Sequence, residues 1–296
     1  MVRHGILIWT TAGLLLAGLC PFALWGATSP VQGTLSPSPV GSVQSTDPTT
    51  GKKPMSVKTT SPITLTVVYN NIPHDARLKT AWGFACLVET SKDTLLFDTG
   101  GDGHILLDNM DILGVDPRQI DAVALSHIHG DHTGGLGAIL ALNDHLDVYV
   151  PISFPLRFKR DVSQHARMIE VDGPVELLNG IRTTGEMGTS IREQALLVET
   201  DEGVIMVTGC AHPGIVSMAE RAAEFGDVYL VMGGFHLSGK SETQIEAIID
   251  QFSHLGVQKV GPSHCTGDLA IRLSEEAYGD DFVESGAGAV IRIGEP

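Results

Sequence analysis

Aromatic residues are scarce in this chain of 296 residues, where they make up 5% of the sequence. Glycine is abundant by contrast, at 34 residues, and 43% of the residues are hydrophobic. A helical bundle is a poor match for this mixture, which instead favours a loop-rich α/β protein. The apolar content is enough for one large domain or two small ones.

Basic residues are also few, with 19 Lys and Arg against 35 Asp and Glu, a formal net charge of -16. The imbalance lies in residues 62–296, because the first 61 residues hold four basic residues and one acidic residue. Such a field repels a polyanion. We therefore expect a small-molecule substrate and no nucleic acid, and the oligomeric state stays open.

The chain contains only four cysteines. Cys210 and Cys265 each lie close to a histidine of interest, so we expect free thiols near a metal site in preference to a disulfide. Cys86 falls in an apolar strand pattern and is most simply a core residue. The fourth, Cys20, lies in the N-terminal apolar segment.

The N-terminus carries a segment typical of export. Residues 1–26 contain Arg3 followed by a nearly unbroken apolar run, which predicts either a cleaved signal peptide or a retained membrane anchor. Residues 27–61 are rich in Pro, Ser and Thr and predict a disordered linker. We therefore expect residues 62–296 to form a periplasmic or extracellular domain, tethered to a membrane if the anchor is retained.

Short apolar runs alternate with helical patterns through this domain. Strands arrive in two groups, each interleaved with helices, which predicts two packed sheets with helices outside. The segment 153–188 shows no clear pattern beyond several short strand candidates. Predicted strands are 64–69, 85–89, 94–97, 122–125, 147–150, 195–199, 204–208, 228–232, 257–260 and 289–293, and predicted helices are 105–113, 135–142, 213–225, a helix capped by Ser241, and one capped by Thr266.

Three histidines and one aspartate lie within six residues, in the run His127-Ile128-His129-Gly130-Asp131-His132. Neutral imidazole and carboxylate are good ligands for Zn²⁺ and similar ions. The run follows a predicted buried strand, and Gly130 permits a tight loop that turns several side chains towards one point. A solvated polar loop is the alternative, but it explains this concentration of ligands poorly.

This run resembles the motif of the metallo-β-lactamase superfamily, and the preceding turn at Asp98 resembles that superfamily's Asp-bearing turn. The resemblance implies an α/β fold, an αββα sandwich of two mixed sheets flanked by helices. The segments 82–84, 208–212, 233–237 and 264–267 resemble one branch, commonly labelled dihydropterin ribofuranosyl-aminobenzene-phosphate synthase.

The resemblance also implies a ligand set. His127 and His129 would bind a first metal ion, and Asp131, His132 and a C-terminal histidine, which His264 matches, would bind a second. Asp98 would orient the histidine loop from behind the ligands.

One position departs from the superfamily's pattern, because Cys210 stands where most dinuclear members carry a bridging aspartate. His212 follows two residues later, and we expect it to supply a first-site ligand near a helix N-terminus. Cys210 either binds metal as a thiolate or lines the pocket. For His236 three roles are open: substrate binding or proton transfer, metal ligation, or a plain loop histidine. We favour a catalytic role for Asp131 and His236.

The resulting hypothesis is a metal-dependent hydrolase, in which a metal-activated water attacks an ester, a phosphoester or a related centre. One or two Zn²⁺ ions are expected, with Mn or Fe as alternatives. A synthase-like transferase is the second candidate. The third is a non-catalytic module that binds a metal or senses a ligand.

Overall fold

A computed structural model describes residues 62–294. The leader or anchor predicted for residues 1–26 and the linker predicted for residues 27–61 lie outside the described residues, so both stay predictions. Between residues 62 and 294, no helix combines the length and the apolar content needed to cross a bilayer.

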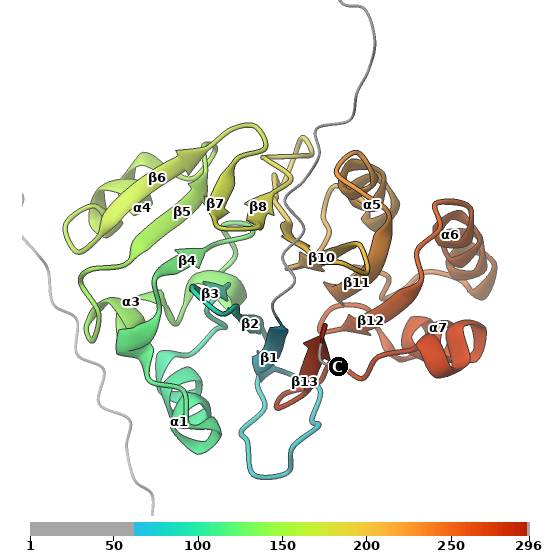
Figure 1. Ribbon diagram of the computed structural model, residues 1–296, viewed down its shortest axis with the longest axis horizontal. Coiled ribbons are helices and arrows are strands. Elements are labelled where there is room, and N and C mark those ends of the chain that lie inside the picture. The colour runs from blue at the N-terminus through green and yellow to red at the C-terminus, as the bar shows by residue number, and fades with distance from the viewer. Residues whose placement is uncertain (1–61, 295–296) are drawn as a thin grey trace, which may run out of the picture. The chain divides into compact units, whose positions relative to one another are not determined.

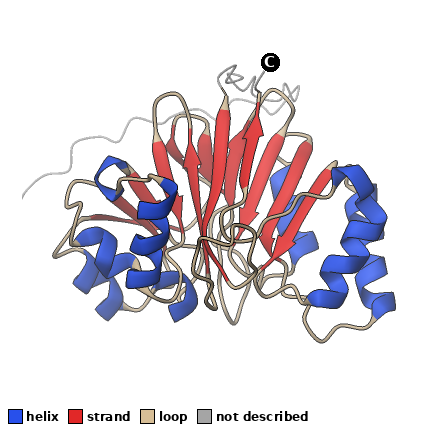
Figure 2. Cartoon of the chain, turned by 90° about the horizontal axis from the view of Figure 1, so that it is seen from below, coloured by secondary structure: helices blue, strands red, loops and turns tan. Residues whose placement is uncertain are grey.

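Two mixed β-sheets face each other, and helices cover the outer face of each (Figures 1 and 2). The first sheet has the strand order β13-β1-β2-β3-β4-β5-β6, and the second has the order β12-β11-β10-β9-β8-β7. In the first sheet β3 to β6 run parallel, and in the second β10 to β12 run parallel. The predicted αββα sandwich is confirmed.

Strand alternation explains the four layers. Leu95 and Phe97 of β3 pack into the core between the sheets, whereas Leu96 faces outward against Met110 of α1. In the second sheet Leu197 of β9 packs in the same way towards Met218 of α5. Successive side chains point to opposite faces of a strand, so a strand buried on both faces reads as a continuous apolar run.

The elements follow each other in two groups of strands with interleaved helices. The strands are β1 (Ile63–Asn70), β2 (Phe84–Glu89), β3 (Thr94–Phe97), β4 (Ala122–Ala124), β5 (Asp147–Pro151), β6 (Arg167–Val171), β7 (Glu176–Leu178), β8 (Ile181–Thr183), β9 (Leu196–Glu199), β10 (Val204–Thr208), β11 (Val228–Gly234), β12 (Lys259–Ser263) and β13 (Val290–Ile293). The helices are α1 (Gly103–Leu113), α2 (Gly130–Thr133), α3 (Leu136–Leu140), α4 (Leu156–Val162), α5 (Ile215–Ala223), α6 (Glu242–His254) and α7 (Asp268–Tyr278), with 3₁₀ turns η1 (Pro117–Gln119) and η2 (Gly279–Asp281).

Two predicted helix starts are wrong. α5 begins at Ile215, because Pro213 lies in a turn closed by the Gly214 N–H on the Ala211 carbonyl. α7 is capped by Gly267 and not by Thr266, whose hydroxyl instead donates to the Ser263 carbonyl. The capping box predicted at Ser241 is confirmed.

The strand predicted for 257–260 lies further along the chain, as β12 (Lys259–Ser263). The predicted strand ended too early because Gly261 and Pro262, which β12 includes, are both rare within strands. They pair with Met232 and Gly233 of β11. The shift brings the end of β12 directly to His264.

Candidate metal centre

The predicted site residues gather at one edge of the sandwich, where parallel strands end. β3 leads into Asp98, β4 into the histidine run, β10 into Cys210 and His212, and β12 into His264. Carboxyl ends of parallel strands meet at the same edge, which explains how segments distant in sequence converge there.

The histidine run splits between a loop and one helical turn. His127 and His129 follow β4, and α2 carries Asp131 and His132. The His127 ring centroid lies 4.7 Å from that of His129, 4.2 Å from that of His132 and 4.7 Å from that of His212. The structure therefore brings His212 to the motif histidines, although His212 precedes α5 by a turn, and its role as a ligand stays a prediction.

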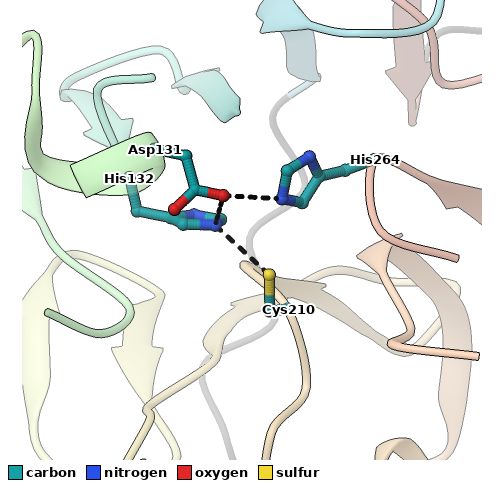
Figure 3. Close-up of side chains that lie close together, drawn as sticks. All are labelled: Asp131, His132, Cys210 and His264. Carbon is teal, nitrogen blue, oxygen red and sulfur yellow. Dashed lines mark hydrogen bonds and ion pairs between the residues drawn. The ribbon is translucent and has the colours of Figure 1, made fainter. Parts of the chain in front are cut away.

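A second group contains Asp131, His132, Cys210 and His264, whose ligand atoms all lie within 4.8 Å of one another. The Asp131 Oδ2 atom lies 3.5 Å from His132 Nε2 and 3.4 Å from His264 Nε2. Cys210 Sγ lies 3.3 Å from His132 Nε2. Figure 3 shows these four side chains pointing towards one another from α2 and from the ends of β10 and β12.

The hydrogen bonding of two ring nitrogens shows whether this donor set suits a metal ion. The Nε2 atoms of His212 and His264 are both buried and make no well-aligned hydrogen bond; His264 Nε2 has only the Asp131 carboxylate, 3.4 Å away. Burial of a polar atom without a partner costs folding free energy, so such an atom indicates a binding partner such as a metal ion. Both face carboxylate, thiol or imidazole donors of the two groups. This donor set fits Zn²⁺ or a similar divalent ion.

Asp98 contacts one histidine directly and a second through Ser126. Its Oδ2 atom lies 2.7 Å from His132 Nδ1 and accepts the Ser126 hydroxyl at 2.7 Å. Because the Ser126 hydrogen is used there, its oxygen accepts the N–H of His127 Nδ1 at 2.9 Å. Both rings therefore direct Nε2 towards the site.

Close packing supports this arrangement. A Cβ at Gly209 would lie 2.1 Å from Ser126 Oγ and 2.8 Å from Asp98 Oδ2. Only glycine fits between β10 and the Asp98 turn.

Burial and neighbouring charges set the protonation of the candidate ligands. Burial lowers the pKa of His127 far below its usual range and that of His212 to about 4, so both rings are neutral. Burial raises the pKa of Asp131, but the neighbouring His132 and His264 outweigh it and hold that pKa well below its ordinary value. Burial also lowers the pKa of His132, but the carboxylates of Asp98 and Asp131 raise it to about 10.

His264 is held by Asn71, which the sequence did not single out, and by Trp82 of the branch motif at 82–84. Its Nδ1 lies 2.9 Å from Asn71 Oδ1, and the Asn71 amide donates back to the His264 carbonyl at 3.2 Å. The Trp82 ring lies 4.7 Å away, centroid to centroid. With Nδ1 engaged, His264 Nε2 is directed at Asp131.

Glu193 also supports the site, although the sequence did not indicate it. This fully buried carboxylate accepts four consecutive backbone N–H groups, from Gly209, Cys210, Ala211 and His212, at 2.8–3.1 Å. It therefore shapes the loop that presents Cys210 and His212. No sequence pattern marks it, because its partners are backbone groups of a distant segment.

Backbone strain is concentrated at the site. Among non-glycine residues of the described chain, positive φ occurs at Asp98, Ala211, His236 and His264, with values of 53–59°. Such conformations are costly and persist where the surroundings impose them, commonly at functional sites. His236 thus joins the site, and its ring centroid lies 4.6 Å from that of His212.

Comparisons with known proteins agree with this geometry. A model of the metallo-beta-lactamase superfamily matches residues 83–275. A relative from Methanocaldococcus jannaschii, named 7,8-dihydropterin-6-methyl-4-(beta-D-ribofuranosyl)-aminobenzene-5'-phosphate synthase, is 30% identical over 71% of this chain and 90% of its own length.

Solved structures show the same fold. A metal-dependent hydrolase of the beta-lactamase superfamily has a TM-score of 0.64 at 24% identity, covering 79% of this chain and 100% of its own. A metallo-beta-lactamase fold protein from Bacillus subtilis has a TM-score of 0.59 at 15% identity, with the same coverage. The chain therefore belongs to the metallo-β-lactamase superfamily, in the branch that carries the name of the dihydropterin synthase.

Proposed function

We propose that the chain is a metal-dependent hydrolase acting on a small-molecule ester, phosphoester or related substrate. The observation that carries the proposal is the convergence of buried donors, among which His212 Nε2 has no hydrogen-bond partner and His264 Nε2 faces only the Asp131 carboxylate, at 3.4 Å. Groups positioned in this way bind metal without reorganisation, which suits catalysis.

The two donor groups would hold two ions. His127, His129 and His212 surround one position, and Asp131, His132 and His264 surround the other. Zn²⁺ is the first candidate, with Mn or Fe as alternatives. A bound ion lowers the pKa of water towards ~7 and polarises the bond under attack.

In this proposal Asp131 both binds metal and orients the attacking water. Its side chain is 21% exposed, whereas those of His132 and His264 are fully buried. The partly open carboxylate can therefore accept a hydrogen bond from an incoming water while its neighbours keep it ionised. Asp131 would hold the nucleophile in line with the substrate.

A cavity of about 230 Å³ adjoins the centre beside His212 and His236. Its remaining wall is mainly apolar, with Ile215, Phe235 and Ile248 among its residues. A small organic group fits this volume and lining better than a polymer does. The net charge of -16 further favours a small substrate over nucleic acid.

Synthase activity is the second candidate, because the relative that is 30% identical over 90% of its length is named as a synthase. A synthase of that kind joins two substrates, so it gives no turnover of a single ester supplied alone. A non-catalytic metal-binding module would likewise turn over nothing.

The test uses 4-nitrophenyl acetate and bis(4-nitrophenyl) phosphate with the purified full chain. We expect turnover of at least one probe, loss of turnover after chelation, and recovery when Zn²⁺ is restored. The His165→Ala variant, which removes an exposed histidine outside the site, should behave as the parent chain. Turnover that persists after complete metal removal would contradict the proposal.

Metal binding is expected to release a proton near pH 7. His132 has a pKa of about 10 in the metal-free protein, so its Nε2 carries a proton that a bound ion must displace. Affinity should therefore tighten about tenfold per pH unit as pH rises towards 10.

Calorimetric titration in buffers of different ionisation enthalpy measures this release directly. The Asp98→Asn variant removes one of the two carboxylate charges that raise the His132 pKa, so it should release fewer protons on binding. Equal proton release by the variant and the parent chain would show that His132 is not the source.

A further inference from the structure

Two free thiols lie side by side at the edge of the metal centre. Cys210 follows β10 and Cys265 follows β12, and they are only 4% and 6% exposed. The Cys265 thiol donates to the Cys210 carbonyl at 3.7 Å, and the two Sγ atoms lie within 4.8 Å of each other. Buried thiols outside a disulfide behave as small apolar groups or as ligands.

His236 brings a third donor to this pair. It follows β11, the strand between β10 and β12, and therefore lies at the same edge of the sheet as the two cysteines. The ligand atoms of Cys210, His236 and Cys265 all lie within 4.8 Å of one another. The positive φ of 55° at His236 shows that the chain accepts backbone strain to place this residue here.

Gly234 makes the approach of the three strand ends possible. A Cβ at this position would lie 2.8 Å from Cys265 Sγ and 3.2 Å from the Cys210 Cα atom. A side chain here would also collide with the Gly209 carbonyl oxygen, 2.3 Å from the Cβ position, so the strand ends approach this closely only with glycine at position 234.

We propose that Cys210, His236 and Cys265 form a separate binding site for a thiophilic metal ion, adjoining the histidine and aspartate centre. Two thiolates and one imidazole are a soft donor set, which selects Zn²⁺, Cd²⁺ or Cu⁺ over Mg²⁺ or Mn²⁺. The sequence leaves three roles open for His236, and this proposal assigns it metal ligation. The exposed His236 provides the ion's route from solvent.

Cys210 links this site to the main centre. Its thiol is also within 4.8 Å of ligand atoms of His132 and of His127 with His212. The thiol that replaces the superfamily's bridging aspartate would therefore be shared between a harder and a softer ion. This inference does not depend on the hydrolase proposal, because it concerns metal binding alone.

The test is titration of the metal-free full chain with Cd²⁺, monitored by the ultraviolet charge-transfer absorption of cadmium thiolates. The parent chain should give the signal of two thiolates, and Cys265→Ser should give about half of it, because Cys210 alone remains. Cys86→Ala, which removes a fully buried thiol outside the cluster, should match the parent chain.

Two outcomes would overturn the proposal. An unchanged signal in Cys265→Ser would show that Cys265 binds no metal, and absence of any signal in the parent chain would show that the thiols are unavailable. His236→Asn provides an independent check, because asparagine tolerates positive φ and removes only the imidazole. This variant should weaken Cd²⁺ binding while keeping both thiolates, and equal affinity would exclude His236.

Elemental analysis keeps this result separate from the hydrolase proposal. Loss of the cysteine site should leave the zinc bound by His127, His129 and His212 in place. If the cadmium signal is present but no ester is turned over, the metal-site inference stands and the hydrolase proposal fails.

Discussion

The His127→Ala variant is expected to lose more than about 100-fold in turnover, because residues that merely support ligands already contribute about 10–100-fold. His127 is fully buried, and its Nδ1 donates to Ser126, so its Nε2 is directed at the site. Burial keeps the ring neutral by lowering its pKa. No neighbouring side chain can take its place, since His129, His132 and His212 each have a position of their own around it.

Metal content must fall together with turnover for this explanation to hold. Elemental analysis of His127→Ala beside the parent chain should show a loss of the first ion, whereas His165→Ala should keep both its metal and its turnover. Circular dichroism establishes that the variant is folded. A folded His127→Ala protein that retained metal and full turnover would exclude the assigned ligand set.

The sequence indicated the candidate ligands because several of them are adjacent along the chain. His127, His129, Asp131 and His132 form one run, so their density alone indicated metal binding. His212 follows a strand that the apolar pattern identified, and His264 follows β12, of which the pattern identified only the first residues. In the described structure these residues come together at the carboxyl ends of the strands.

The supporting residues could not be predicted in the same way, because each acts across a long separation. Asn71 reaches His264 across 193 positions, and Glu193 reaches the backbone at His212 across 19. Neither contact leaves a periodic or spaced pattern in the sequence. Such partners are defined only once the two sheets have packed and brought their loops together.

Boundary errors have a local physical reason. Pro213 is typical of a first helical position, but here a turn from Ala211 to Gly214 precedes the helix. That turn is imposed by Glu193, which holds the Ala211 and His212 N–H groups. Tertiary hydrogen bonding therefore overrides the local preference of the sequence.

Because Glu193 holds this loop, its removal is the second change for which we expect a large effect, here on the free energy of unfolding. The Glu193→Ala variant is expected to lose about 3–5 kcal/mol of unfolding free energy, because four buried backbone N–H groups lose their acceptor. Three of them donate to Oε1 and the His212 N–H donates to Oε2. Urea unfolding of the metal-free chain measures the difference without a contribution from bound ions.

Two variants distinguish loss of these hydrogen bonds from a general effect of mutation. Glu193→Gln keeps the shape and one acceptor oxygen, so its loss should lie between those of the parent chain and the alanine variant. Glu220→Ala, which removes an exposed glutamate on α5, should change stability by less than about 0.5 kcal/mol. If Glu193→Ala were as stable as Glu220→Ala, the loop bearing Cys210 and His212 would hold its shape without the carboxylate. Because that loop contributes Cys210 to both groups of candidate ligands and His212 to one of them, a destabilised Glu193→Ala protein should also bind Zn²⁺ more weakly, and Glu193→Gln should again be intermediate.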